Sequence, residues 1–321
     1  MYEEIATELV ELGPQKRFLG NRICCRFCGT KDQSAFGGRT NAHTFPEALG
    51  NKFLFSLDEC RSCNERFAVY EDALCKATGP FLTLGGVRGK RGVRQTGRSN
   101  SGSVIQHRDD DGHRHISVRS KGSLENVVGI DSRTGVVRLQ IPIEGDKFVP
   151  LYAYKALTKI AIALLPEDEL HRFRRTIESL QSRDMKPAIG PLQVGFSYGY
   201  VGNAPPTLAG SLIRRREEYA SIPYVIAIFV AGSVCFQIWL RSDDKDNQVP
   251  ESGKLGIRWT SQLPKPEGGY HPIKYSEPLQ FNWSSVDHQF QPFEAFELRF
   301  NPITTEGVFT PIPREVKTSY G

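Results

Sequence analysis

Two pairs of closely spaced cysteines are the clearest chemical feature of this sequence. Each pair has the spacing Cys-x-x-Cys, which turns two thiolates toward one point; the pairs are Cys25 with Cys28 and Cys60 with Cys63. Four thiolates make the tetrahedral sulfur set that zinc prefers in closed structural sites. We therefore predict one structural zinc ion, which would stabilise a segment too short to build a sufficient core. Unrelated free thiols are the alternative, but they do not explain the shared spacing.

The other three cysteines are given no role as ligands. Cys24 competes with Cys25, but only Cys25 forms a Cys-x-x-Cys pair with Cys28. Cys75 and Cys235 are expected to be buried apolar residues rather than reactive thiols. An odd total of seven cysteines argues against a disulfide framework and agrees with metal binding.

One histidine, His43, lies between the two cysteine pairs, within the stretch AHTFPEALGN at residues 42–51. An imidazole can accept a proton near neutral pH, which is what a general base for water must do. A single histidine is more often structural or exposed than catalytic, so His43 alone does not establish an active site.

The histidine stretch and the cysteine pairs, in this order, resemble the HNH endonuclease family. The closest branch has the pattern AH-hydrophobic-P-E-x-L-G-N followed by CxxCN, and the resemblance covers residues 23–75. It implies a ββα-metal module that hydrolyses phosphodiester bonds and leaves 5′-phosphate and 3′-hydroxyl ends. It also implies that His43 is the general base, that Asn51 orients this histidine through the backbone, and that Asn64 helps to bind one catalytic Mg²⁺ or Mn²⁺ ion.

One position departs from that pattern. Many members of the family place an acidic metal ligand directly before the histidine, whereas this chain has Ala42. Hard cations prefer carboxylate oxygen, so another acid would have to supply the charge. The candidates are Glu47, Asp58, Glu59 and Glu71. Glu71 follows Asn64 by seven residues and so shares its helical face, but a solvated acid fits equally well. Asn64 could also be the N-cap of the helix that follows.

Basic residues gather in the Gly-rich segment after the second cysteine pair. Arginine pairs with phosphate oxygens, and glycine lets the main chain approach a strand closely. We expect this segment to contact nucleic acid, and DNA rather than RNA. The alternative interpretation is a solvated flexible loop, which has the same composition. The residues are Arg88, Lys90, Arg91, Arg94 and Arg98. The acidic run Asp109–Asp111, with three histidines nearby, is expected to be a polar turn rather than a second metal site.

Hydrophobic periodicity indicates the elements that must position these residues. It predicts helices over residues 1–19, 151–164, 170–180 and 212–219. Alternating patterns predict strands at 136–141, 192–201 and 255–260, and a buried hairpin at 222–241. The hairpin segment is nearly long enough to cross a membrane. Pro223, Gly232 and Gln237 interrupt it, so we expect no membrane span.

We therefore expect an α+β protein with a small zinc-stapled module and a larger mixed α/β domain rich in strands. The predicted division is 1–78 for an N-terminal helix and the HNH module, 79–122 for a basic connector or β-ribbon, and 123–321 for the C-terminal domain. The net charge of +5 permits a polyanionic partner without requiring one. The N-terminus lacks the basic-then-apolar order of a secretory signal, which predicts a cytoplasmic protein.

The expected function is that of a metal-dependent endonuclease acting on DNA. By analogy with bacterial proteins of this type, the C-terminal domain would position, regulate or multimerise the nuclease, frequently in defence against phage. Two alternatives stay open: a zinc-dependent nucleic-acid-binding protein that has lost cleavage, and an adaptor whose zinc module mediates assembly.

Overall fold

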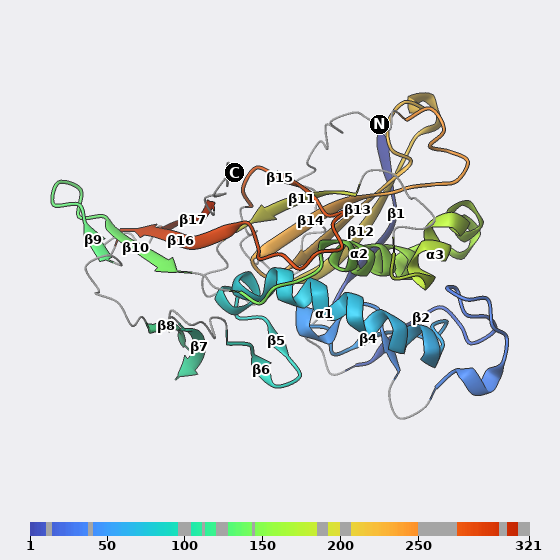
Figure 1. Ribbon diagram of the computed structural model, residues 1–321, viewed down its shortest axis with the longest axis horizontal. Coiled ribbons are helices and arrows are strands. Elements are labelled where there is room, and N and C mark those ends of the chain that lie inside the picture. The colour runs from blue at the N-terminus through green and yellow to red at the C-terminus, as the bar shows by residue number, and fades with distance from the viewer. Residues whose placement is uncertain are drawn as a thin grey trace, which may run out of the picture.

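The computed structural model has a mixed α+β fold, in which two long helices lie between a large sheet and several short strands (Figure 1). It describes residues 1–10, 15–37, 41–95, 104–110, 113–119, 128–142, 145–184, 192–199, 207–249, 275–301 and 307–313. Within these residues, no helix combines the length and the apolar character that crossing a membrane requires.

The predicted hairpin at 222–241 is confirmed and forms the centre of a six-stranded antiparallel sheet. Its strands β13 (Val225–Ala231) and β14 (Val234–Leu240) are buried along their whole length and turn at Gly232, which has a φ of 55°. Alternate residues of each strand point to opposite faces, and both faces are covered, which explains the continuous apolar run. The sheet order is β1 (Tyr2–Leu9), β12 (Leu208–Arg215), β13, β14, β11 (Gln193–Tyr198) and β15 (Leu279–Asn282).

The predicted helix over residues 1–19 is wrong, because this segment contains strands. β1 pairs antiparallel with β12 at the edge of the large sheet, and a register shift lies between Glu4 and Ala6. Such a bulge breaks the two-residue period that marks a strand in sequence. The predicted helix at 212–219 is also wrong: residues 212–215 complete β12, and only the 3-10 turn Glu217–Tyr219 follows.

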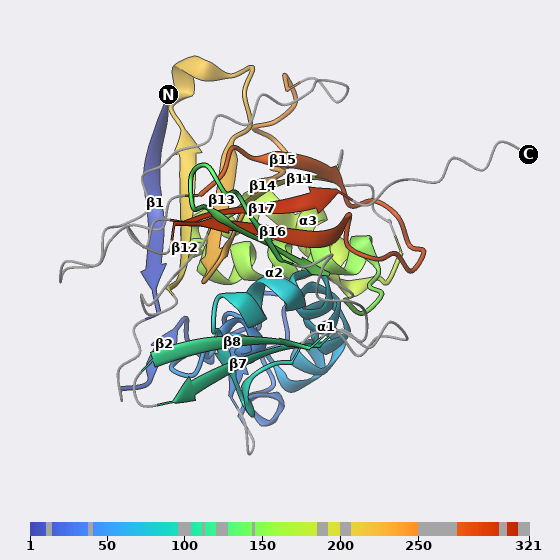
Figure 2. The ribbon, with the colours of Figure 1, turned by 90° about the vertical axis from the view of Figure 1, so that its left-hand side faces the viewer.

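The helices α1 (Arg61–Leu84) and α2 (Pro150–Leu164) pack together and cover one face of the large sheet (Figure 2). α2 confirms the helix predicted at 151–164. The segment predicted as a helix at 170–180 contains a 3-10 turn (Glu167–Phe173) and then the short helix α3 (Arg174–Gln181).

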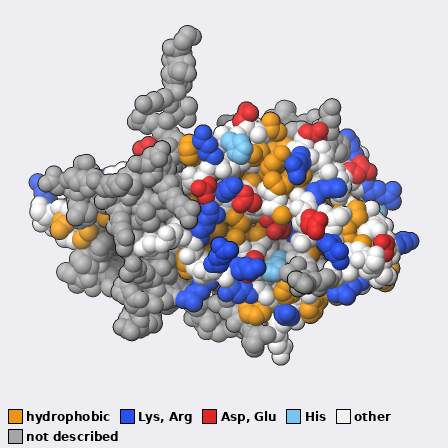
Figure 3. All heavy atoms as spheres, turned by 60° about the horizontal axis from the view of Figure 1, so that its bottom comes forward, with side chains coloured by type: hydrophobic (Ala, Val, Ile, Leu, Met, Phe, Trp, Pro, Cys, Tyr) orange, Lys and Arg blue, Asp and Glu red, His pale blue; other side chains and the backbone are white. Residues whose placement is uncertain are grey.

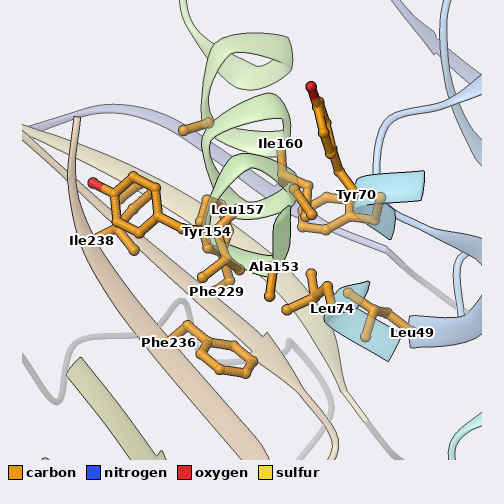
Figure 4. Packing of buried hydrophobic residues seen from close by; sticks show 14 of the residues in the cluster. Leu49, Tyr70, Leu74, Ala153, Tyr154, Leu157, Ile160, Phe229, Phe236 and Ile238 are labelled. Atoms are coloured by element: carbon orange, nitrogen blue, oxygen red, sulfur yellow. The ribbon is translucent and has the colours of Figure 1, made fainter. Parts of the chain in front are cut away.

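A single cluster of buried apolar side chains joins the N-terminal and C-terminal parts of the chain. Figure 4 shows Tyr70 and Leu74 of α1 beside Ala153 and Leu157 of α2, with Phe229 of the sheet close by. The cluster extends from Val10 to Phe296. The domain boundary predicted at residue 78 therefore lies inside α1, in the middle of a shared core.

Three short strands form a separate sheet in the order β2 (Arg17–Leu19), β4 (Leu54–Ser56), β3 (Ala42–His43). β2 runs parallel to β4, and β3 runs antiparallel to it. Two hairpins follow α1, namely β5 (Arg88–Gly89) with β6 (Gly92–Val93) and β7 (Val104–Asp110) with β8 (His113–Arg119). Both hairpins lie within the segment 79–122 predicted to be a basic connector or β-ribbon, although α1 extends into its first residues.

A four-stranded sheet completes the described chain. Its order is β17 (Gly307–Pro313), β16 (Phe293–Phe300), β10 (Val137–Pro142), β9 (Val128–Ile130). β10 confirms the strand predicted at 136–141, and β11 confirms the one at 192–201. The strand predicted at 255–260 lies outside the described residues.

Candidate functional site

The four predicted cysteine ligands come together in the structure. The sulfur atoms of Cys25, Cys28, Cys60 and Cys63 all lie within 4.8 Å of one another. Cys25 Sγ is 3.9 Å from Cys63 Sγ, and Cys28 Sγ is 3.6 Å from Cys60 Sγ. Zinc–sulfur bonds of about 2.3 Å hold tetrahedral sulfur ligands about 3.8 Å apart. The four sulfurs could therefore hold a metal ion such as zinc.

Two local structures aim these sulfurs at one point. A tight turn after Cys25 is closed by the bond from Gly29 N–H to the Cys25 carbonyl (2.8 Å), and Gly29 has a φ of 73°. Cys60 is the N-cap of α1, and Cys63 lies in its first turn. The positive end of a helix favours thiolates. A hydrogen bond with Cys63 and bonds from backbone N–H groups lower the pKa of Cys25.

The remaining cysteines also lie where the sequence predicts them. Cys24 stays outside the sulfur cluster, which confirms the choice of Cys25. Cys75 and Cys235 are buried, and burial raises the pKa of the Cys75 thiol to about 12. Neither is therefore a reactive thiolate near neutral pH.

The first cysteine turn is anchored to the far end of α2. Arg26 donates from Nη1 to the carbonyls of Ile162 (2.6 Å) and Leu165 (2.9 Å), and from Nε to Asp58 (2.7 Å). A cation at the C-terminal end of a helix satisfies carbonyls that lack partners within the helix. Gln181 adds a bond from its side-chain amide to the carbonyl of Phe27 (3.1 Å). The four-cysteine cluster is thereby tied to the helices of the C-terminal part.

His43 lies on β3, directly opposite Phe55 of β4, and the two rings meet edge to face at 4.7 Å. The imidazole is half-buried, and its Nδ1 has no hydrogen-bond partner among the described residues. Burial lowers the pKa of His43 below its usual value; Glu71 opposes this shift, Lys159 adds to it, and Glu47 opposes it. The lowered pKa favours the neutral imidazole, which is the form that can accept a proton.

Asn51 fixes the loop that joins β3 to β4. Its fully buried side-chain amide donates to the carbonyls of Phe45 (2.9 Å) and Leu54 (2.7 Å), and its oxygen accepts from the N–H of Leu54 (2.9 Å). The Leu54 carbonyl also accepts from Thr44 N–H, the residue after His43. Asn51 thus holds the backbone beside the histidine without touching its ring.

A buried lysine that the sequence analysis missed lies next to His43. Lys159 of α2 donates from Nζ to the His43 carbonyl (2.6 Å) and lies 3.1 Å from both Glu59 and Glu71. Burial works against its charge, but the two carboxylates outweigh this effect and raise the pKa of Lys159. Burial also raises the pKa of Glu59 to about 7. The sequence feature that could have identified Lys159 is its position inside the apolar helical run of residues 151–164.

Lys159 and Arg26 engage three of the four acids predicted as possible ligands of a catalytic cation. Glu59 and Glu71 are engaged by Lys159, and Asp58 is engaged by Arg26. Apart from the four cysteines, the His, Cys, Asp and Glu residues that the structure describes form no group of three able to share an ion. Glu47 is the one candidate acid for which the described residues give no ion pair.

Asn64 lies in the first turn of α1, not at its cap. Its N–H donates to the carbonyl of Cys60 (3.0 Å), which is the N-cap. The alternative interpretation of Asn64 as the N-cap is therefore wrong, because the helix begins one turn earlier than that interpretation requires. With Asn41 and Ala42, Asn64 lines a cavity of about 210 Å³.

The predicted basic residues are carried by the β5–β6 hairpin and the segment after it. A second cavity, of about 720 Å³, is lined by this hairpin, the second half of α1 and the β3–β4 loop. Its charged residues are Lys76, Lys90, Arg91, Arg94, Glu47 and Asp146. Arg94 forms an ion pair with Asp146. Figure 3, in which the bottom of Figure 1 is turned forward, shows Lys and Arg side chains spread over that face with Asp and Glu among them.

Arg88 and Arg98 are the two remaining residues predicted to contact nucleic acid. Arg88 belongs to β5 and is exposed, but it does not line the larger cavity. Arg98 lies outside the described residues, as do the side chains of the predicted polar turn at 109–111.

Comparison of the chain with protein-family models, with curated protein sequences and with solved structures gives no match.

Proposed function

We propose that this protein is an endonuclease that hydrolyses phosphodiester bonds in DNA, with His43 as the general base. The observation that carries the proposal is a half-buried histidine that lies on a strand between the two cysteine pairs of the chain and is followed by a second strand and a helix. This order of elements is what the HNH resemblance implies, and the resemblance itself comes from the sequence.

In the proposed reaction, His43 removes a proton from water as the water oxygen attacks phosphorus. The bond between phosphorus and the 3′ oxygen breaks, and the leaving oxygen takes its proton from solvent. The products are a 5′-phosphate and a 3′-hydroxyl. Asn51 acts as a positioning residue, because its hydrogen bonds fix the backbone on both sides of the strand pair.

The strand of nucleic acid would approach across the larger cavity. Lys90 and Arg91 stand at the tip of the β5–β6 hairpin, and Lys76 faces them from α1. Phosphate contacts of this kind supply affinity and make binding sensitive to salt. Glu47 lines the same cavity and influences the pKa of His43, which connects the two regions.

The resemblance also implies a catalytic Mg²⁺ or Mn²⁺ ion. Of the four candidate acids, Asp58 is engaged by Arg26, and Glu59 and Glu71 are engaged by Lys159, so we assign no step of the reaction to this ion. The dependence of cleavage on added Mg²⁺ or Mn²⁺ measures whether the reaction requires this ion.

The test is plasmid cleavage by the purified protein with Mg²⁺, with Mn²⁺ and without added metal, beside His43→Ala. The proposal expects nicked or linear product from the wild-type protein and at least a 100-fold lower rate from His43→Ala, because general bases contribute about 10²- to 10⁴-fold. His171→Ala is the matched control, since His171 is exposed and lies after α2. Equal cleavage by His43→Ala would refute the assignment of the base.

A second candidate is a DNA-binding protein that does not cut. The observation that favours it is Lys159, which forms ion pairs with two of the candidate metal-binding acids, Glu59 and Glu71. Binding of plasmid without cleavage under every metal condition would support this candidate.

We further propose that the part of the chain after residue 123 positions or regulates the site in a cytoplasmic defence against phage. The pairing of β1 with β12 and the packing of α1 on α2 support a positioning role. Plaque counts on cells that express the wild-type protein or His43→Ala would test the defence. Light scattering would show whether copies assemble.

A further inference from the structure

One row of side chains crosses the small sheet from its edge to His43. Phe18 on β2 pairs in register with Phe55 on β4, and Phe55 pairs with His43 on β3. Residues paired in this way point to the same face of a sheet. The row therefore spans two strand spacings, about 10 Å.

The outer end of this row is an exposed aromatic ring. Phe18 is 45% exposed, whereas Phe55 is 7% exposed. The two rings stack at 5.7 Å with an interplanar angle of 28°, so one face of Phe18 covers Phe55 and the rest of the ring meets solvent. Phe18 therefore presents an aromatic surface to solvent on an edge strand of the small sheet.

The charged side chains near the outer end of the row are mostly positive. The Lys16 ammonium lies 5.8 Å from the centre of the Phe55 ring, and Lys52 is exposed in the loop before β4. Arg17 is paired with Glu8, which is the one acid in direct contact with these cations in the described structure. An aromatic surface flanked by cations is how proteins bind unpaired nucleotides, with stacking for the base and positive charge for the backbone.

We infer that Phe18 is a stacking platform for an unpaired nucleobase, and that the protein acts on single-stranded DNA or on duplex DNA with unpaired nucleotides. This inference rests on the proposed function, since it names the substrate of the His43 site. In a fully paired duplex, both faces of each internal base are already stacked on neighbouring bases, so no base is free to stack on Phe18. The stacked nucleotide brings its backbone toward His43 along the row.

The test measures binding separately from cleavage. Full-length protein carrying His43→Ala is titrated into a fluorescein-labelled single-stranded DNA 20-mer, the same strand in a duplex, and the same sequence as RNA. Phe18→Ala in this background should weaken single-strand binding by about 5- to 100-fold, the range for loss of one stacked base. Phe18→Tyr, which keeps the ring, should bind like the parent, and duplex binding should change by less than about twofold.

The matched control is Phe290→Ala. Phe290 is 39% exposed and has a lysine, Lys147, over its ring, but it lies outside the small sheet. Its removal should leave single-strand binding unchanged. As a direct probe, the fluorescence of Phe18→Trp should fall when single-stranded DNA binds. Thermal melting of each variant identifies any loss of folding.

The outcomes separate this inference from the proposed function. Unchanged single-strand binding by Phe18→Ala, an equal loss on the duplex, or no single-strand binding by the parent overturns the platform. Selective loss of single-strand binding supports the platform even if no variant cleaves DNA, in which case the endonuclease proposal alone fails. A preference for RNA over DNA of the same sequence overturns the assignment of DNA as the substrate.

Discussion

The cysteine centre and the His43 site share the same short segment of chain, yet they are built in different ways. The four sulfurs come from two local turns whose geometry follows from residues a few positions apart. The surroundings of His43 come from α2, more than a hundred residues away, because Lys159 donates to the His43 carbonyl and engages both neighbouring acids. A motif can therefore bring four cysteine sulfurs together by itself, whereas the electrostatics around a histidine depend on the whole fold.

The first prediction concerns the cysteine centre and has the largest expected effect. Cys63→Ser should abolish zinc binding and cost at least about 4 kcal/mol of folding stability, because metal binding in such sites is coupled to folding. Metal analysis should find about one zinc per wild-type chain, and urea unfolding should measure the loss. Cys24→Ser is the matched control, since its thiol lies outside the sulfur cluster. Full stability of Cys63→Ser would contradict a structural role for the centre.

The second prediction concerns the contribution of α2 to the His43 site. Lys159→Met should cost about 3–5 kcal/mol of folding stability, because it leaves two carboxylates near a buried site without their cation. Lys76→Met is the control: its pair with Asp72 is partly exposed, and exposed pairs contribute about 0–1 kcal/mol. Urea unfolding compares both variants with the wild type. If Glu59→Gln in the Lys159→Met background restored nothing, the carboxylates would not be the cause of the loss.

The third prediction concerns the charge of His43 and has the smallest expected effect. Its pKa is lowered in the folded protein, so the folded state binds fewer protons than the unfolded state around the usual pKa of about 6.5. Its contribution to stability is therefore full above that pH and decreases as the pH falls. Glu71→Gln should lower the pKa of His43 further, because Glu71 raises it.

Imidazole NMR titration gives this pKa directly, and cleavage assays should place the acid limb of the pH profile at the same value. Glu217→Gln is the control, since Glu217 lies in the turn after β12. A rise in the pKa of His43 in Glu71→Gln would show that another group controls the charge.

The sequence predicts the local parts of this structure well. The ligand choice of Cys25 over Cys24 depends only on spacing, and the β13–β14 hairpin is visible as two apolar runs around Gly232. The strand β1 could not be identified in this way, because its bulge obscures the period and its partner is distant in the chain.

The same limit applies to the acids near His43. Sequence alone named Glu59 and Glu71 as free carboxylates for a metal, since nothing local indicates that a lysine pairs with them. Lys159 occupies one position of an apolar helical pattern, and only the packing of α2 on α1 brings its ammonium to these acids. The stacked row from Phe18 to His43 likewise depends on strand pairing between segments that no motif connects.

The pairing of β1 with β12 has a consequence for biosynthesis. Thr7 and Ser211 are hydrogen-bonded across these strands although 204 positions separate them. A ribosome adds about 5–20 residues per second, so β1 waits about 10–40 s before its partner strand has been made. During that time its backbone groups can pair with another nascent chain. Slower translation of this region, or the loss of a chaperone that covers it, should therefore reduce the yield of soluble protein.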